Sequence, residues 1–116
     1  MYIYIIECID NSLYTGIAKD IVKRLKEHYF QTKNCAKYTK SHKMIGLRAL
    51  WFTDSKIIAS KVEYQIKKLT REKKLQLIND YENDIPTFIN NDFKDVNFIS
   101  TKKQLEIFSQ VVKNVK

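Results

Sequence analysis

Five residues among the first 63 have side chains whose chemistry could be combined in one site: the phenols Tyr4 and Tyr14, the guanidinium of Arg24, the imidazole of His28 and the carboxylate of Glu63. Phenols and imidazoles can hold or transfer protons, and a guanidinium binds oxyanions through two parallel N–H groups. A single carboxylate can hold Mg²⁺ when water and a substrate phosphate complete the octahedron. Each group also has an ordinary structural use, such as core packing for a tyrosine or an i, i+4 ion pair with Lys67 for Glu63. Only their arrangement together would make them a reactive site.

The opening segment predicts a β-hairpin that carries the two tyrosines. Residues 2–8 are rich in Tyr and Ile, which favour strands, and residues 13–18 have similar character. The turn-forming residues 10–12 between them are too few to connect parallel strands. Tyr4 and Tyr14 are therefore expected on paired antiparallel strands.

A helix over about residues 20–30 is expected next, with Asp20 as its N-cap. Arg24 and His28 are one turn apart on this helix, so they project from the same side. The residues expected to be buried are Ile21, Leu25, Val22 and Tyr29, and those expected to face water are Lys23, Lys26 and Glu27. The hairpin phenols would then face a cation and an imidazole.

Beyond this helix, residues 31–43 read as a basic loop with one aromatic, and residues 46–53 predict a third strand. A helix capped by Asp54 or Ser55 should follow, then a shorter helix to about residue 80 and a terminal helix from Thr101. The apolar residues at helical spacing are Ile58, Val62, Ile66 and Leu69 in the first of these, and Leu105, Phe108, Val111 and Val112 in the last. The expected fold is α+β: a small three-stranded antiparallel sheet flanked by helices, with a C-terminal helical extension.

Positive charge is concentrated in the middle of the chain. The net charge is +8, and residues 19–74 hold 16 Lys or Arg against 5 Asp or Glu, a net +11. Lysine and arginine release condensed counterions when they neutralise a nucleic-acid backbone, so this segment favours a phosphate-bearing partner. The alternative is a solvated lysine-rich surface that serves solubility.

A chain of 116 residues with 44% hydrophobic content predicts a globular protein, most simply one domain. No apolar run approaches the length of about 18 residues that a membrane span needs, and the N-terminus lacks the basic region of a signal peptide. We expect a soluble cytoplasmic protein without a membrane partner. Cys8 and Cys35 have neither the number nor the spacing of a disulfide framework or zinc site and are expected to be free thiols.

The order and spacing of the five candidate residues resemble the GIY-YIG endonuclease domain. Tyr2-Ile3-Tyr4 stands where the family has Gly-Ile-Tyr, and Tyr14-Thr15-Gly16 stands where it has Tyr-Ile-Gly. Residues 13–17, 36–39 and 66–70 look most like the small stand-alone bacterial members, which are similar to the catalytic domain of the Slx-type nucleases. The resemblance covers about residues 1–80 and leaves 81–116 as an extension with a terminal amphipathic helix.

Three positions depart from the family pattern. Tyr2 replaces Gly in the first motif and Thr15 replaces Ile in the second, at positions that serve strand packing. Ile17 stands where some members, including the excision-repair nuclease, place a lysine. Lys19 is the candidate substitute for that cation.

The resemblance implies a metal-dependent endonuclease that hydrolyses phosphodiester bonds in DNA, including branched or structured DNA, by a one-metal mechanism. It implies Glu63 as the ligand of Mg²⁺ or Mn²⁺ and Arg24 as the group that stabilises charge on the phosphate. Tyr4 and His28 are rival general bases, with Tyr14 positioning the proton path; a phenol must have its pKa lowered to ionise at pH 7, whereas an imidazole needs no shift. The residues expected to contact the nucleic acid are Lys19, Lys23, Lys37, Tyr38 and Lys40.

Two other functions are compatible with the sequence. One is a nucleic-acid-binding module that keeps this fold without cleaving, and the other is an interaction protein that forms a homodimer or binds a partner through its terminal helix. An intact set of five candidate residues favours the nuclease, because binding alone needs no carboxylate beside the phosphate. The sequence leaves open whether DNA or RNA is the substrate.

Overall fold

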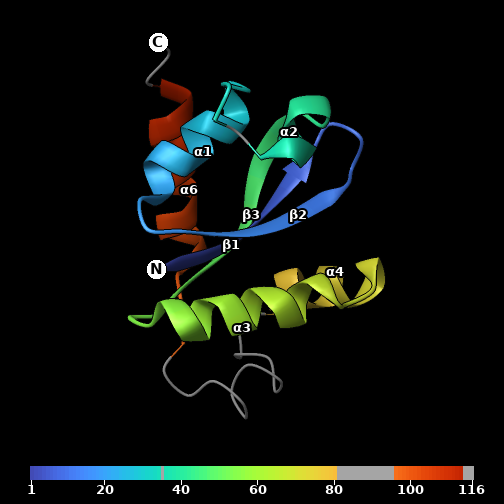
Figure 1. The fold of residues 1–116 in the computed structure, drawn as a ribbon, viewed down its shortest axis with the longest axis vertical. Coiled ribbons are helices and arrows are strands. Elements are labelled where there is room, and N and C mark those ends of the chain that lie inside the picture. Colours follow the sequence, from blue (N-terminus) through green and yellow to red (C-terminus); the bar gives the residue numbers. More distant parts are fainter. Residues whose placement is uncertain (35, 81–95, 114–116) are drawn as a thin grey trace.

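β1 (Tyr2–Cys8) is one of the two inner strands of the sheet in the computed structural model, which describes residues 1–34, 36–80 and 96–113. The other elements, in chain order, are β2 (Leu13–Ala18), α1 (Ile21–Tyr29), α2 (Lys37–Ser41), β3 (Met44–Phe52), α3 (Lys56–Lys67), α4 (Arg71–Asp80), β4 (Asn97–Phe98) and α6 (Thr101–Lys113). The strands form one antiparallel sheet in the order β2, β1, β3, β4, with helices around it (Figure 1). The predicted α+β fold is confirmed.

Helices cover both faces of the sheet, which explains why β1 does not alternate between apolar and polar residues. Ile3 and Ile5 belong to the core on one face, and Tyr4 and Ile6 belong to the core on the other. All four side chains are at most 1% exposed. Because successive strand residues point to opposite faces, a strand buried on both sides reads as a continuous apolar run.

The two cores are built from different helices. The Ile3 core contains Ala59, Val62 and Ile66 of α3 with Leu77 and Ile78 of α4, and the Tyr4 core contains Ile21 and Leu25 of α1 with Ile107 and Val111 of α6. In Figure 1, α1 and α6 lie on one side of the sheet and α3 and α4 on the other. The hairpin therefore lies between α1 and α3, the helices from which Arg24, His28 and Glu63 arise.

The sheet has four strands, so the prediction of three was wrong. The fourth strand, β4, consists of Asn97 and Phe98, which pair with Phe52 and Trp51 at the end of β3. Two residues are too short to show the alternating pattern by which a strand is identified in a sequence. Their pairing depends on β3, which lies more than 40 positions earlier in the chain.

The terminal helix has a different buried face from the one predicted. Gln104, Ile107 and Val111 are buried, whereas Leu105 is 57% exposed and Val112 is 36% exposed. The Gln104 side chain donates a hydrogen bond to the backbone oxygen of Leu47 on β3 at 2.8 Å. A glutamine satisfied in this way can lie inside, so the inward face includes a polar residue that an apolar pattern passes over.

The predicted N-caps of α1 and α3 are confirmed, whereas the predicted loop of residues 31–43 contains a short helix. Asp20 accepts a hydrogen bond from the Lys23 amide at 3.1 Å and caps α1 as expected, and Ser55 caps α3 through the Ile58 amide at 3.2 Å. The supposed loop of residues 31–43 contains the short helix α2, whose first turn buries Thr39. Its single buried residue leaves no apolar periodicity to detect.

The buried face of α1 consists of Ile21, Leu25 and His28. Val22 and Tyr29, which were expected inside, are only partly buried, and Lys26 and Glu27 are partly covered where full exposure was expected. His28 replaces Tyr29 on the inward face because its ring nitrogens find hydrogen-bond partners there.

Cys8 is a buried free thiol, as predicted. Cys35 lies outside the described residues, and so does the segment 81–95 that forms the first part of the predicted extension. Across the described ranges, the helices lack the combination of length and hydrophobicity that crossing a membrane requires.

Candidate active site

The hairpin places Tyr4 directly opposite Gly16 in the register of β1 and β2. Directly opposed residues project from the same face, so the Tyr4 ring extends across the position where a side chain at residue 16 would lie. A methyl group at Gly16 would approach the Tyr4 hydroxyl oxygen to 2.5 Å and Cζ to 2.7 Å. The second glycine of the motif is therefore required by the tyrosine of the first.

Tyr4 is hydrogen bonded to His28, with 2.6 Å between the phenol oxygen and the imidazole Nε2. Both residues are buried, at 1% and 0% exposure. Leu25 and Ile21 anchor the inner face of α1 in the same core, which fixes His28 one turn further along the helix. The predicted meeting of the hairpin phenol and the helix imidazole is confirmed.

The second nitrogen of His28 is held by Thr39, a residue that the sequence did not single out. The Nδ1 atom lies 2.9 Å from the Thr39 hydroxyl oxygen, and this hydroxyl donates to the backbone oxygen of Ala36 at 3.1 Å. Thr39 is fully buried, whereas Lys37 and Lys40 of the same helix are exposed. The segment has no apolar periodicity from which the burial of Thr39 could have been predicted.

The electrostatics of the site keep Tyr4 and His28 neutral in the free protein. Burial is the main cause that raises the pKa of Tyr4, with the nearby Tyr14 and Glu63 acting in the same direction and Arg24 opposing them. Burial, followed by the positive charge of Arg24, lowers the pKa of His28 from 6.5 to about 4. Among the protein's own groups, burial outweighs the guanidinium, so the phenol pKa is raised rather than lowered.

Arg24 is partly buried and carries an internal counterion. Its Nη1 donates to the Glu27 carboxylate at 2.9 Å and to the backbone oxygen of Asn34 at 2.8 Å. Hydrogen bonding from the guanidinium also acts to lower the pKa of Tyr4, so Arg24 lies beside the phenol. Sequence reasoning missed this role of Glu27, although its i, i+3 spacing from Arg24 was a signal.

Glu63 approaches the same cluster from α3. Its charge is the smallest of the contributions that raise the pKa of Tyr4, so the carboxylate lies within electrostatic range of the phenol. Its side chain is 22% exposed and pairs with Lys67 at 3.3 Å, while the Lys67 Nζ lies 5.7 Å from the centre of the Tyr14 ring. The direct partner of the Glu63 carboxylate is therefore Lys67, in the ordinary i, i+4 pair, and its effect on Tyr4 is electrostatic.

Tyr14 connects the buried residues to the basic helix α2 through a series of ring contacts. Its ring centre lies 5.5 Å from that of His28 and 5.5 Å from that of Tyr38, which in turn stacks on His42 at 4.0 Å. Tyr38 is thus already packed against two rings. A nucleic-acid base could stack on it only by replacing one of them or by meeting its edge.

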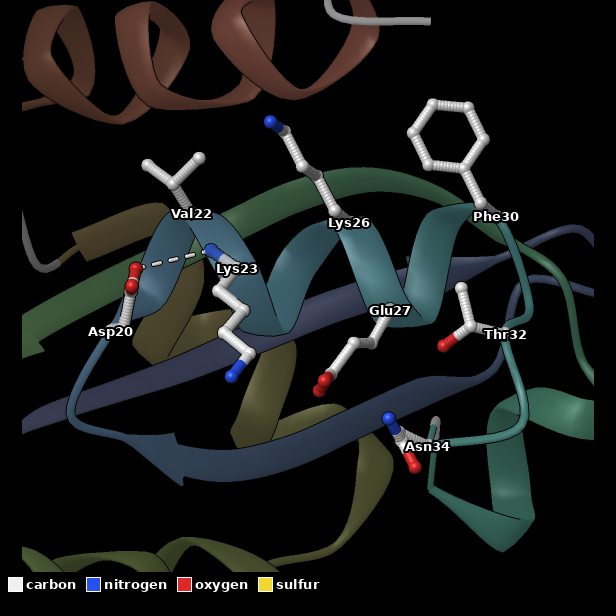
Figure 2. A pocket seen from close by; sticks show the side chains of 8 residues that line it. All are labelled: Asp20, Val22, Lys23, Lys26, Glu27, Phe30, Thr32 and Asn34. Atoms are coloured by element: carbon white, nitrogen blue, oxygen red, sulfur yellow. Dashed lines mark hydrogen bonds between the residues drawn. The ribbon is translucent and has the colours of Figure 1, made fainter. Parts of the chain in front are cut away.

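The lysines predicted to contact nucleic acid, Lys19, Lys23, Lys37 and Lys40, are all exposed. Lys23 lines a hollow of about 620 Å³ on the outer face of α1, together with Lys26, Glu27 and Asn34 (Figure 2). Because Glu27 and Asn34 are the two partners of Arg24, this hollow adjoins the guanidinium from the solvent side. The structure places these cations at the surface.

The family model of the GIY-YIG catalytic domain matches residues 1–76. A UPF0213 protein from Fusobacterium nucleatum is 39% identical over 102 residues, which cover 88% of this chain and 95% of the relative. A UPF0213 protein from Syntrophus aciditrophicus is 51% identical over 77 residues, covering 66% and 87%. The solution NMR structure of a UPF0213 protein from Bacillus halodurans is 36% identical, covers 78% of this chain and 92% of its own, and superposes with a TM-score of 0.45. Because the family model matches well over half of its length, the chain belongs to the GIY-YIG catalytic domain family.

Proposed function

We propose that the protein is an endonuclease that hydrolyses phosphodiester bonds in DNA with the help of one divalent metal ion. The observation that carries this proposal is the hydrogen bond between Tyr4 and His28, with Arg24 beside the phenol and Glu63 within electrostatic range of it. In this proposal Tyr4 and His28 carry the proton, Arg24 binds the phosphate oxygens, and Glu63 holds the metal ion. Membership of the GIY-YIG catalytic domain family supports a nuclease function.

The donor set near Tyr4 fits a metal ion held mainly by the substrate. Among the described residues, no group of three or more His, Cys, Asp or Glu side chains is arranged to hold a metal. The single carboxylate of Glu63 suits Mg²⁺ or Mn²⁺, which accept one protein ligand when water and phosphate oxygens supply the rest. When bound, the ion would neutralise charge on the phosphate and the leaving oxygen.

The protein's own residues would then move the proton of the attacking water. As the water oxygen bonds to phosphorus and the bond to the leaving oxygen breaks, the water proton passes to the Tyr4 oxygen. The Tyr4 proton passes to Nε2 of His28, and the leaving oxygen takes a proton from solvent. The low pKa of His28 makes this transfer unfavourable in the free protein, and the negative charge of a bound phosphate would raise that pKa. Tyr4 and His28 therefore act as one unit, and the choice between them as rival bases is unnecessary.

Arg24 would bind the phosphate by exchanging partners. Its guanidinium is paired with Glu27 in the free protein, at a position 29% exposed that adjoins the hollow on α1. A phosphate arriving from that side offers two oxygens to the planar fork, which suits Arg better than Lys. The exposed cations Lys19, Lys23, Lys37 and Lys40 would contact neighbouring phosphates.

A cleavage assay tests the proposal. Labelled duplex, forked and four-way DNA, and matched RNA, are incubated with Mg²⁺, Mn²⁺ or EDTA and either the wild type or Glu63→Ala. We expect metal-dependent cleavage of DNA, fastest on branched forms, and loss of cleavage with binding retained in Glu63→Ala. Binding without cleavage of any substrate by the wild type would instead identify a non-catalytic nucleic-acid-binding module.

A further inference from the structure

The imidazole of His28 lies between two hydroxyl groups, one from β1 and one from α2. Its Nε2 is 2.6 Å from the Tyr4 oxygen and its Nδ1 is 2.9 Å from the Thr39 oxygen. A neutral imidazole carries one proton, so one nitrogen must donate and the other must accept. The direction of these two hydrogen bonds decides which nitrogen is free to take a proton.

The hydroxyl of Thr39 has one proton and two neighbours, the Nδ1 atom of His28 at 2.9 Å and the backbone oxygen of Ala36 at 3.1 Å. Because the Ala36 oxygen can only accept, the hydroxyl donates its proton to that oxygen. Towards His28 the Thr39 oxygen can therefore offer only a lone pair, which requires a proton on Nδ1. The lone pair of the imidazole is then on Nε2.

The surroundings of Tyr4 agree with this assignment. The guanidinium beside the phenol has donors and no acceptor, so it can only direct an N–H group at the Tyr4 oxygen. The phenol proton must then point to another atom, and Nε2 of His28 is at hydrogen-bond distance. With the opposite tautomer, both His28 and Arg24 would donate to Tyr4, and no described hydrogen bond would accept the buried phenol proton.

The position of Thr39 is itself secured by its short helix. The side-chain amide of Gln31 donates to the backbone oxygens of Thr39 at 3.0 Å and of Lys40 at 3.3 Å. Thr39 is fully buried, whereas Lys37 and Lys40 on either side of it are exposed. The segment between α1 and β3 thus delivers one hydroxyl to the back of the His28 ring.

We propose that Thr39 is a positioning residue that sets the tautomer of His28, so that Nε2 is the proton acceptor facing Tyr4. Thr39 is fully buried behind the imidazole, so in this proposal it acts through His28 alone. Its catalytic consequence rests on the proposed nuclease function, whereas the tautomer is a property of the free protein. The two can therefore be tested separately.

Nitrogen-15 NMR of the uniformly labelled wild-type protein at neutral pH tests the tautomer without any substrate. We expect a pyrrole-like Nδ1 and a pyridine-like Nε2 for His28. In Thr39→Val, which keeps the side-chain shape and removes the acceptor, we expect a measurably larger share of the proton on Nε2, because only the Tyr4 hydrogen bond then opposes that tautomer, and in Thr39→Ser we expect the wild-type pattern. A proton on Nε2 in the wild type overturns the proposal whether or not the variants fold, and so does an unchanged tautomer in a folded Thr39→Val.

The cleavage assay provides the second measurement. Thr39→Val should lower kcat about tenfold, the loss expected for one buried hydrogen bond, with KM unchanged, and Thr39→Ser should restore kcat. Equal kcat for Thr39→Val and the wild type would overturn the catalytic part of the proposal. If the wild type cleaves nothing, the proposed function fails, and the NMR result still decides whether Thr39 sets the tautomer.

Discussion

Tyr4 and Gly16 face each other across β1 and β2, and the end of the Tyr4 ring occupies the space that a side chain at residue 16 would fill. Gly16 has no positive φ angle, so its backbone conformation would tolerate other residues. The requirement for glycine comes from the close approach of the phenol. The two halves of the GIY-YIG motif are therefore sterically dependent on each other. The first half contributes the Tyr4 ring, and the second contributes a glycine without a side chain, against which that ring can pack.

Replacing Gly16 with alanine should displace the Tyr4 hydroxyl from His28. A methyl group 2.5 Å from the phenol oxygen forces the ring or the strand to move, which should cost about 1–3 kcal/mol of stability by overpacking. A shift of about 1 Å in a reacting group can lower the rate roughly a hundredfold. Denaturant unfolding and the cleavage assay measure the two effects.

Gly46→Ala is the matched control, because a methyl group there meets nothing within 4 Å and its φ is not positive. Its stability and cleavage rate should stay close to wild type. A Gly16→Ala protein with wild-type stability and rate would show that the Tyr4 ring does not need this space.

Arg24→Lys should slow cleavage while leaving DNA binding within a few-fold of wild type. The positive charge is kept, but the planar fork that can bind two phosphate oxygens is lost, which we expect to cost about a hundredfold in rate. Arg48→Lys is the control, since Arg48 is exposed and pairs with Glu7 away from the cluster. Single-turnover rates with pre-bound DNA separate the chemical step from binding, and equal rates for the Arg24 variant would remove it from the catalytic set.

Glu27→Gln should strengthen DNA binding. The Glu27 carboxylate occupies Nη1 of Arg24 at 2.9 Å and lines the hollow on α1, so it opposes an incoming phosphate by competition and by charge. A partly exposed pair of this kind contributes about 0.2–1 kcal/mol, which predicts an affinity gain of a few-fold. Glu72→Gln on α4 makes the same change in net charge at an exposed position and should have a smaller effect. Fluorescence anisotropy at fixed salt compares the two, and equal affinities would mean that Glu27 does not restrain Arg24.

The residues predicted from the sequence and those missed differ in how far their partners lie along the chain. Tyr4, Tyr14 and His28 sit on adjacent elements with a strong apolar pattern, so their meeting followed from a hairpin and the next helix. β4 exists only because β3 offers an edge, and Gln104 is buried only because the Leu47 carbonyl accepts its hydrogen bond. Thr39 is buried by contact with His28, in a segment without periodicity of its own. Local patterns carry no record of such long-range partners.

The pH dependence of stability should report the burial of His28. Its pKa falls from 6.5 to about 4 on folding, so the unfolded chain binds the proton more tightly than the native protein does. The stability that comes from the neutral imidazole is fully present above pH 6.5, declines as the pH falls, and is lost by about pH 4, a change of about 3 kcal/mol. Urea unfolding at pH values between 4 and 7 measures how the free energy of unfolding changes with pH.

The variant His28→Gln should flatten this pH dependence, whereas the control His42→Gln, which leaves the Tyr4 partner intact, should retain it. Parallel curves for the wild type and His28→Gln would show that folding leaves the pKa of His28 unchanged, so that burial does not keep the imidazole neutral below pH 6.5.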